Sequence, residues 1–400
     1  MRASQRDHLF SFAEYAEGYN SYYLNIFTSS IPRYFSLIKF DLVVFSWSFL
    51  GNRFTHQTFR DSLKKIQLIK SYDCPKIALP QDEFSNTAAL CDVINEFSID
   101  IVYSVSPESE WKKMYHTVDF NKVKFYQVLT GYLDENLIRK ISIMHANASS
   151  RPIDIGYRSG SAVYWGRFNL VKFTIAELFY EYALKRELKT DIAFGWNNFL
   201  MGDEWYDFLM QCKYMPGVEG GSSIHDWDGS LFDTVKKFLL ANPKATFDLI
   251  ESNCIPEGKD GELTVVALSP RHLEACLTKT CQILVEGAYN GILIPGRHYI
   301  ELKKDFSNIE TVMDHIVRDD LRDEIIQNAY IDIVLSGKYT YKSFVDFILD
   351  TALEKREVQP KTSASLHLLN KVLDKLSWKY VKIFSFLRDI RDFWRTKLNR

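Results

Sequence analysis

The chain has 400 residues, of which 46% are hydrophobic and 25% are charged, a composition typical of a folded globular protein with about two domains. Its formal net charge of −2 excludes the concentrated basic surface that a nucleic-acid-binding protein needs. The six cysteines are scattered and form no C-x-x-C pair, which argues against a zinc site or a disulfide scaffold and favours free thiols.

The N-terminus carries no apolar signal segment. The most apolar stretch, Leu37 to Leu50, is interrupted by Lys39 and Asp41 and is too short to span a bilayer. We therefore expect a cytoplasmic protein, and peripheral attachment to the inner face of the cell membrane stays open.

Residues 1–150 alternate between strand-like and helix-like segments, after an unusual opening helix at Asp7–Glu17. Apolar runs that end in polar loops, with helical patterns between them, predict a parallel sheet covered by helices on both faces. The expected strands are Tyr22–Phe27, Asp41–Trp47, Lys76–Pro80, Ile99–Val105 and Lys122–Val128, and the expected helices include Thr58–Ile69 and Thr87–Phe97.

Small polar residues before Pro152 suit a linker, and the alternation then restarts. The expected strands of this second block are Ile153–Tyr157, Asp191–Phe194, Tyr214–Val218, Leu263–Leu268 and Gln282–Val285, and the expected helices are Val171–Leu188, Glu204–Cys212, Leu231–Leu240, Thr246–Ser252, Pro270–Thr280, Leu321–Leu335 and Tyr341–Leu353. Two such blocks predict an α/β protein of two Rossmann-like, doubly wound domains that face a cleft. We place these domains at residues 1–150 and 151–357, followed by a helical tail at 358–400.

The loop after Leu263–Leu268 carries the strongest chemical signal, because ligands of open α/β sheets bind beyond the carboxyl ends of strands. Ser269 is a good N-cap for a helix that begins at Pro270, and the free N–H groups at such a helix end attract phosphate. Arg271 and His272 add positive charge there. Glu274 lies one turn later, where a carboxylate can accept hydrogen bonds from ribose hydroxyls. A capped surface helix has the same pattern, so that alternative stays open.

Three motifs follow one another from residue 269: S-P-R-x-x-E-A, Q-I-L-x-E-G-x-Y-x-G-I-L and H-Y-I-x-L-x-x-D-F-S-N. This run closely resembles the C-terminal domain of a bacterial glycosyltransferase group related to spore-maturation and surface-polysaccharide glycosyltransferases. The resemblance covers most of residues 35–350 and fades in the tail. It implies a GT-B fold whose second domain binds a nucleotide-sugar donor, with Gly287, Tyr289, His298 and Tyr299 near the 269–274 loop.

The resemblance also implies a pair of glutamates that flank the sugar donor. In the wider group, a Glu-Gly loop meets the sugar and a later Glu-Ala pair meets the ribose. By similarity these are Glu219, with Gly220 and Gly221, and then Glu274. The two glutamates are much farther apart here than in that group, and residues 230–260 between them look like a helical insertion.

Positive charge is also needed for the diphosphate of the sugar donor. The wider group uses an Arg and a Lys near the start of the second domain, and Arg158, Arg167 and Lys172 are the candidates here. Each of the three could equally be a solvated surface charge. Because Arg, Lys and helix dipoles can stabilise a leaving diphosphate, we expect neither a metal nor another cofactor.

A general base should come from the first domain. Asp82 and Glu83 follow the strand Lys76–Pro80 at its carboxyl end, where a carboxylate could accept the proton of an acceptor hydroxyl. The D-x-D triplet Asp226-Trp227-Asp228 is of a kind that holds metal in other glycosyltransferases. It follows no apolar strand here, and we interpret it as a loop.

The predicted tail combines basic and aromatic residues. From Leu366 to Arg400 there are nine Lys and Arg against three Asp. A basic aromatic helix suits an anionic membrane surface, but its apolar face could equally pack on the two domains.

These patterns together predict a metal-independent glycosyltransferase. It would move a sugar from a nucleotide-sugar donor to a glycan or lipid-linked glycan in cell-surface polysaccharide synthesis, with no nucleic-acid partner. Two alternatives remain: a transferase that uses a CMP-linked acidic sugar, and a non-catalytic GT-B-like module that binds glycan or a partner protein.

Overall fold

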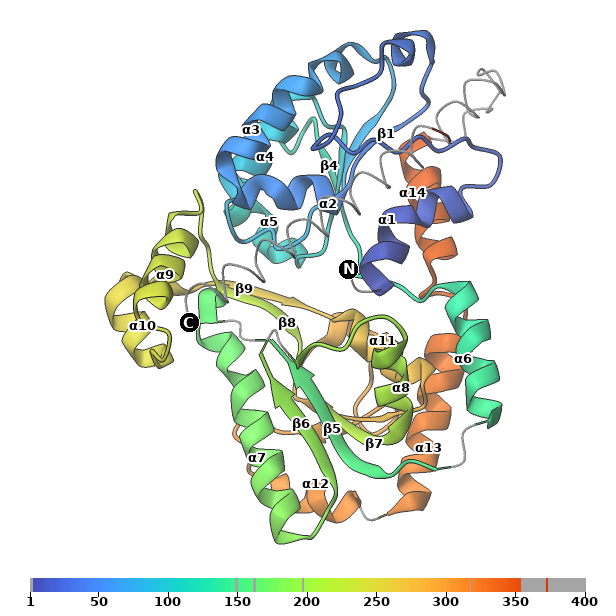
Figure 1. Ribbon diagram of the computed structural model, residues 1–400, viewed down its shortest axis with the longest axis vertical. Coiled ribbons are helices and arrows are strands. Elements are labelled where there is room, and N and C mark those ends of the chain that lie inside the picture. Colours follow the sequence, from blue (N-terminus) through green and yellow to red (C-terminus); the bar gives the residue numbers. More distant parts are fainter. Residues whose placement is uncertain are drawn as a thin grey trace, which may run out of the picture.

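The computed structural model describes residues 3–147, 150–160, 163–195, 198–316, 318–353 and Val372. Two parallel β-sheets form separate α/β units, one above the other in Figure 1. This topology confirms the predicted α/β class with two Rossmann-like units. The predicted tail lies outside the described residues, apart from Val372.

The first sheet has the strand order β1-β2-β3-β4, and all of its pairings are parallel. Its elements are β1 (Val43–Phe45), β2 (Lys76–Ala78), β3 (Ile101–Ser104), β4 (Lys124–Gln127), α1 (Ala3–Tyr15), α2 (Trp47–Leu50), α3 (His56–Lys65), α4 (Thr87–Glu96) and α5 (Glu108–Met114), with 3-10 turns at Arg33–Leu37, Gly51–Phe54 and Gln67–Ser71. Successive side chains of a strand point to opposite faces. Ile77 and Ile101 therefore pack toward α1, whereas Ala78 and Val102 pack toward α3, α4 and α5.

The strand expected at Tyr22–Phe27 is absent, and this prediction was wrong. The backbone turns there instead, because the Asn25 carbonyl oxygen accepts hydrogen bonds from the amides of Thr28 and Ser29. Residues 18–32 form an irregular wall beside β1 rather than a fifth strand.

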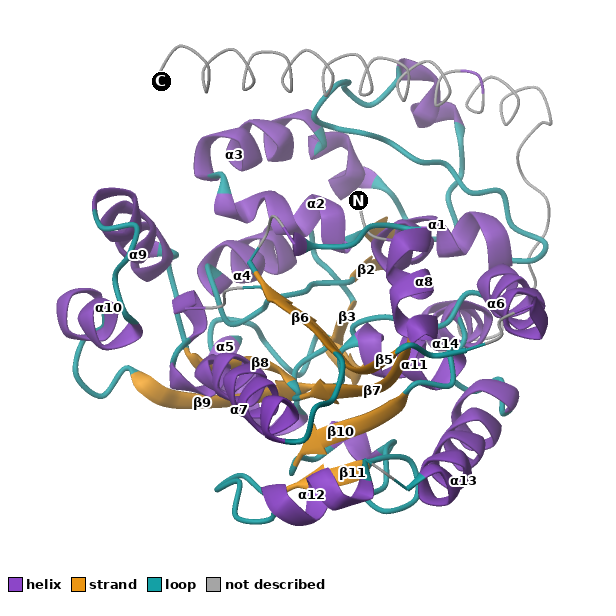
Figure 2. Ribbon diagram, turned by 60° about the horizontal axis from the view of Figure 1, so that its bottom comes forward, coloured by secondary structure: helices purple, strands orange, loops and turns teal. Residues whose placement is uncertain are grey.

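The second sheet is also fully parallel, with the order β11-β10-β7-β5-β6. Its elements are β5 (Ile153–Ser159), β6 (Thr190–Phe194), β7 (Cys212–Gly217), β10 (Cys281–Val285), β11 (Ile300–Leu302), α6 (Glu135–Asn147), α7 (Val171–Lys185), α8 (Asp203–Gln211), α11 (Pro270–Leu277), α12 (Ile309–His315) and α13 (Asp319–Ala329), with 3-10 turns at Val163–Trp165, Arg167–Leu170 and Tyr289–Gly291 and a π-helical turn at Tyr330–Leu335. Helices α7, α12 and α13 cover one face, and α6, α8 and α11 cover the other. Figure 2 shows β10 and β11 next to α12 and α13.

A hairpin and two helices are inserted between the two units. The antiparallel strands β8 (Gly220–Ile224) and β9 (Asp260–Ala267) enclose α9 (Ser230–Ala241) and α10 (Phe247–Cys254). The expected helical insertion is therefore present. The strand expected at 263–268 exists as β9, but it belongs to this hairpin and not to the parallel sheet. Gly221 allows the pairing, because a Cβ atom there would lie 1.8 Å from the Val265 carbonyl oxygen.

Two helices pack on the unit that their position in the chain does not suggest. Helix α6 packs on the second unit through Ile141. Helix α14 (Tyr341–Leu353) returns to the first sheet and packs beside α1, with Phe344 and Ile348 in the core around Tyr103. The described packing thus divides the chain differently from the segments 1–150 and 151–357, because apolar helix faces, and not sequence position, decide which sheet a helix covers.

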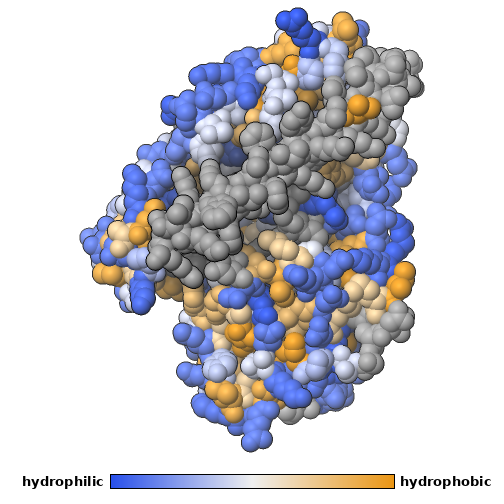
Figure 3. All heavy atoms as spheres, viewed as in Figure 1, coloured by the Kyte–Doolittle hydropathy of each residue, from blue (hydrophilic) through white to orange (hydrophobic). Residues whose placement is uncertain are grey.

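The remaining features of the fold concern its cysteines, the hydropathy of its helices and its surface. All six cysteines are free, as the sequence predicts. Among the described helices, none combines the length and the apolar character that crossing a bilayer requires. Figure 3 shows apolar side chains gathered over β5 and β6 and mostly polar ones over α3 and α4.

Candidate active site

A small cavity lies where α11 begins, between the second sheet and the first helix of the chain. Its volume is about 70 Å³. It is lined by four of the predicted site residues, Arg158, Ser269, Arg271 and Glu274, and by Ser4, Phe199, Leu200, Gly202, Trp205, Tyr206 and Pro270. The 269–274 loop therefore forms one wall of a cavity, although β9 before it is not a strand of the parallel sheet.

Glu274 is the anionic member of this cavity, and it is 8% exposed. Its carboxylate accepts a hydrogen bond of 2.7 Å from Trp205 Nε1 and one of 3.4 Å from the Tyr206 hydroxyl. These two aromatic residues of α8 fix the carboxylate at the cavity wall.

Arg158 and Arg271 supply positive charge at the same wall. The guanidinium of Arg158 stacks at 4.3 Å on the Phe208 ring and pairs with Asp191 at 2.7 Å. Its carbonyl oxygen accepts a hydrogen bond of 3.0 Å from Arg271 Nη1. Arg158 therefore positions Arg271, whose other guanidinium N–H groups remain for an anion.

Lys172 lies at the start of α7, and its charge interacts with charged residues of both units. Its ammonium donates a hydrogen bond of 2.5 Å to Asn169 Oδ1. The pKa of Lys172 is lowered to about 8, mainly by burial and also by repulsion from Arg271, while attraction by Asp82 opposes both effects. Among the described residues, no carboxylate lies within salt-bridge distance of Lys172 or Arg271. Two neighbouring cations without a carboxylate partner are typical of an anion-binding site.

Asp82 faces these cations from the first unit. It follows β2, is solvent-exposed and has a left-handed backbone conformation with φ of 50°. Enough protein surrounds the carboxyl group to raise its pKa, while the charges of Arg53 and Lys172 act in the opposite direction. Asp82 is thus a carboxylate at the junction of the two units, with electrostatic coupling to a cation of the other unit.

Arg53 holds the loop that carries Asp82, and sequence reasoning missed it. The side chain is fully buried and donates hydrogen bonds of 2.5–3.1 Å to four carbonyl oxygens, those of Leu50, Gln81, Asp82 and Ser85. Burial lowers its pKa to about 10. Nothing in the local sequence marks this arginine, because its partners lie up to 32 positions away.

Glu83, the second predicted carboxylate after β2, does not line the cavity at the start of α11. It is fully buried, and its carboxylate accepts from the Ser104 hydroxyl at 2.7 Å, the Val105 amide at 2.7 Å, the Ser106 amide at 3.3 Å and the Tyr115 hydroxyl at 2.5 Å. Burial raises the pKa of Glu83, and these hydrogen bonds oppose that rise. Its role is to tie the loop after β2 to the loop after β3.

The Glu219 carboxylate is also occupied within the fold. It is 5% exposed and accepts hydrogen bonds from the amides of Ala288 at 3.2 Å and Tyr289 at 2.7 Å. Gly287 leaves room for it, since a Cβ atom there would lie 2.5 Å from Glu219 Oε2. Gly220 and Gly221 form the start of β8. Through these contacts Glu219 links the loop after β7 to the loop after β10. Neither Glu219 nor the three glycines line the cavity.

Five further predicted residues lie away from the cavity. Arg167 is paired with Glu251 of the inserted helices. The buried ring of His272 lies between Gln282 at 2.8 Å and the Val218 carbonyl oxygen at 3.3 Å.

The other three residues belong to the two motifs that follow the 269–274 segment in the chain. His298 is 3% exposed and contacts Asp332 at 3.0 Å. Tyr289 and Tyr299 are fully buried in the core next to each other, with ring centroids 5.4 Å apart. The resemblance implied that these residues lie near the sugar donor, whereas the structure buries their side chains in the core.

The D-x-D triplet forms a junction between the insertion and the first unit, as the loop interpretation allows. Asp226 accepts hydrogen bonds from the amides of Leu231 and Phe232 at the start of α9, and its backbone bonds to Phe84 and Asn86 at 2.8 and 2.6 Å. Its carboxylate also accepts a hydrogen bond of 3.2 Å from the Ser85 hydroxyl, so it is occupied by the start of α9 and by the first unit.

A scan against protein-family models finds no match, and neither does a search of curated proteins. Solved structures give similarities in fold. HepE from Anabaena in complex with UDP-glucose has a TM-score of 0.41 at 11% identity over 78% of each chain. The pneumococcal O-GlcNAc transferase GtfA with UDP and GlcNAc has a TM-score of 0.39 at 9% identity over 74% of this chain and 54% of that one. Sucrose-phosphate synthase from Thermosynechococcus elongatus has a TM-score of 0.41 at 9% identity over 80% and 74%. These scores are too low to carry an argument about activity.

Proposed function

We propose that this protein is a glycosyltransferase that takes its sugar from a nucleotide-sugar donor. The observation that carries the proposal is the arrangement of charges at the junction of the two units. Arg271 and Lys172 of the second unit lack a carboxylate partner among the described residues, and their charges act on each other. Arg271 lines the cavity beside Glu274. The charge of Asp82, on the first unit, acts on Lys172.

Each of these groups suits one part of the reaction. The Glu274 carboxylate would accept hydrogen bonds from the ribose hydroxyls. Arg271, Lys172 and the N-terminal end of α11 would stabilise the diphosphate, whose negative charge increases as the glycosidic bond breaks. Asp82 would accept the proton of the attacking hydroxyl group. Transfer without a bound metal ion belongs to this proposal, because these cations supply the charge stabilisation.

The cavity must open before a sugar donor can bind. Its volume of about 70 Å³ is smaller than the roughly 300 Å³ or more of typical ligand sites. Ser4 at the start of α1 and residues 199–202 close it. The proposal therefore includes a displacement of one or both of these segments, and closure over the bound donor would exclude water.

The finer assignments rest on the sequence motifs. The resemblance to spore-maturation and surface-polysaccharide glycosyltransferases supports a role in cell-surface polysaccharide synthesis, with a glycan or lipid-linked glycan as acceptor.

Replacing Glu274 by Gln should weaken nucleotide binding by about 10- to 100-fold, because ribose hydroxyls lose a charged acceptor worth about 1.5–3 kcal/mol. The shape of the side chain and the hydrogen bond from Trp205 can be retained. Isothermal titration with UDP, GDP, ADP, TDP and CMP measures this effect, and Glu177→Gln on the exposed face of α7 is the matched control. A response to CMP alone would favour a transferase of a CMP-linked sugar. Unchanged affinity in Glu274→Gln would refute the site, and no binding to the wild-type chain would favour a non-catalytic module.

The affinity of the protein for a nucleoside diphosphate should fall as the pH rises through about 8. Only the protonated form of Lys172 attracts the diphosphate, and its pKa lies at about 8 in the free protein. The loss should approach about tenfold per pH unit above that value, because bound anion raises the pKa and binding then takes up a proton. Lys172→Arg should remove this dependence, since arginine stays charged. A pH dependence shared by wild type and Lys172→Arg would show that another group titrates.

A further inference from the structure

A second and much larger cavity lies in the first unit, at the outer edge of its sheet. Its volume is about 580 Å³, which falls within the roughly 300–1,000 Å³ of small-molecule sites. Helix α1, the irregular segment 18–45, the first turns after β1 and the end of α14 contribute to its walls. None of the residues assigned to sugar transfer above lines it.

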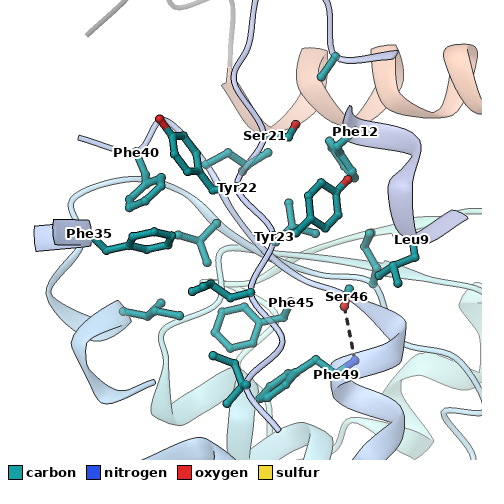
Figure 4. A pocket seen from close by; sticks show the side chains of 18 of the residues that line it. Leu9, Phe12, Ser21, Tyr22, Tyr23, Phe35, Phe40, Phe45, Ser46 and Phe49 are labelled. Atoms are coloured by element: carbon teal, nitrogen blue, oxygen red, sulfur yellow. Dashed lines mark hydrogen bonds between the residues drawn. The ribbon is translucent and has the colours of Figure 1, made fainter. Parts of the chain in front are cut away.

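The walls of this cavity are apolar and rich in aromatic rings. Figure 4 shows Tyr22, Phe35 and Phe40 together on one side and Phe45 with Phe49 on another. Ring centroids lie 5.3 Å apart between Phe35 and Phe40 and 5.9 Å apart between Phe45 and Phe49. Rigid rings of this kind keep the space open instead of collapsing into it, and they favour a hydrocarbon ligand over a sugar or a nucleotide.

One end of the cavity reaches the edge of the sheet where the reaction would occur. Ser46, which directly follows β1, and Leu79, which directly follows β2, both line it. Asn52 is also a wall residue, and the next residue is Arg53, which holds the backbone of Asp82. A molecule in this cavity could therefore have its apolar part at the outer edge and its polar end toward Asp82.

The outer wall has the charge and hydropathy of a surface that meets anionic lipid. Residues 25–40 contain Arg33 and Lys39 and no acidic residue. Two large apolar side chains of the same segment are exposed, Phe27 to 37% and Leu37 to 76%. Exposed apolar residues next to lysine and arginine are typical of segments that lie at a membrane interface.

We propose that this cavity binds the hydrocarbon chain of a lipid-linked acceptor, taken up from an anionic membrane surface through residues 25–40. The acceptor role rests on the proposed glycosyl transfer, whereas the binding of a hydrocarbon chain does not. The chain would occupy the aromatic cavity, and the hydroxyl group to be glycosylated would lie at the edge near Asp82.

The test is direct binding of alkyl β-glucosides to the full-length protein. Affinity should rise from hexyl to octyl to decyl glucoside by about fourfold per added methylene, because each buried methylene contributes about 0.8 kcal/mol. Leu24→Trp and Ile31→Trp each add a large ring to a partly buried cavity wall and should weaken the binding of decyl glucoside at least tenfold. Leu184→Trp, on an exposed position of the second unit, should not.

Two further measurements separate the possible failures. Melting temperature and UDP affinity should be the same in the three tryptophan variants as in the wild type, which shows that each variant is folded and that its nucleotide site is intact. If the wild type binds nucleotide but no alkyl glucoside, the cavity proposal is overturned and the proposed function stands. If it binds alkyl glucoside but no nucleotide, the hydrocarbon site stands and the acceptor role is overturned.

A separate double variant tests whether residues 25–40 bind an anionic membrane surface. Arg33→Glu with Lys39→Glu should float at least severalfold less with phosphatidylglycerol-containing vesicles than the wild type. The control is Lys185→Glu with Lys189→Glu, which reverses two exposed charges on the second unit. Equal flotation of the two double variants would overturn the membrane source of the ligand.

Discussion

Replacing Glu83 by Ala is expected to lower the free energy of unfolding by about 3–4 kcal/mol. The substitution removes a buried carboxylate that accepts four hydrogen bonds, and it leaves the amides of Val105 and Ser106 without that acceptor. A buried polar group without a partner costs about 1–3 kcal/mol. Urea denaturation followed by circular dichroism measures the change.

Glu83→Gln is the matched control for this prediction. Its amide oxygen can accept from the two backbone amides, and the hydroxyl hydrogens of Ser104 and Tyr115 can turn so that these oxygens accept from the amide NH₂ group. The variant should lose less than about 1 kcal/mol. A loss as large as that of Glu83→Ala would show that the negative charge itself is needed.

The stability of the wild type relative to Glu83→Gln should depend on pH, and the sign of this dependence follows from the pKa of Glu83. Burial raises the pKa of Glu83 in the folded state, so the folded protein binds its proton more tightly than the unfolded chain does. The contribution of Glu83 to stability is then fully present below the pKa of the unfolded chain and decreases as the pH rises. The wild type should therefore lose stability relative to Glu83→Gln from mildly acidic to neutral pH.

Replacing Asp82 by Asn is expected to lower kcat by about 10²- to 10⁴-fold, the usual contribution of a general base. The side chain is exposed, and the fold uses only its backbone carbonyl, through Arg53. The melting temperature and the affinity for nucleotide should therefore hardly change. Steady-state kinetics with saturating sugar donor, together with thermal unfolding, separate the chemical effect from a structural one.

Asp119→Asn is the control. Asp119 is an exposed carboxylate that precedes β4, so it lies at the amino ends of the strands, whereas Asp82 lies at their carboxyl ends. In the wild type, kcat should fall on the acidic side of a pKa that lies above the ordinary value of an aspartate, since the base acts only when it is deprotonated. The protein that surrounds the carboxyl group raises this pKa, although part of the residue is exposed to solvent. If kcat of Asp82→Asn equals that of the wild type, the proton of the acceptor goes elsewhere.

The sequence alone was sufficient for most of the strands and for one wall of the cavity at the start of α11. Buried parallel strands such as β2 and β10 are continuous apolar runs, and that signal is local. Ser269, Arg271 and Glu274 were found in the same way, since a helix start that attracts phosphate is encoded in a few adjacent residues. The strand predicted at 22–27 was wrong, because aromatic and apolar residues that line a cavity have the same sequence pattern as a buried strand.

The roles of buried polar residues could not be read from the sequence. Asp82 and Glu83 are adjacent and chemically similar, yet one faces the junction of the units and the other is enclosed by β3 and α5. Which of two neighbours points outward depends on the turn after β2, and Arg53 fixes that turn through bonds across up to 32 positions.

What the sequence by itself determined is therefore the α/β class, most of the strands and the start of α11 at Pro270, because short-range patterns encode each of them. Only the tertiary structure decided that Asp82 and not Glu83 faces Lys172, that α14 returns to the first sheet, and that a large aromatic cavity lies beside β1. The physical reason is the same in all three cases: burial and hydrogen bonding between distant residues select one orientation among several that the local sequence permits equally.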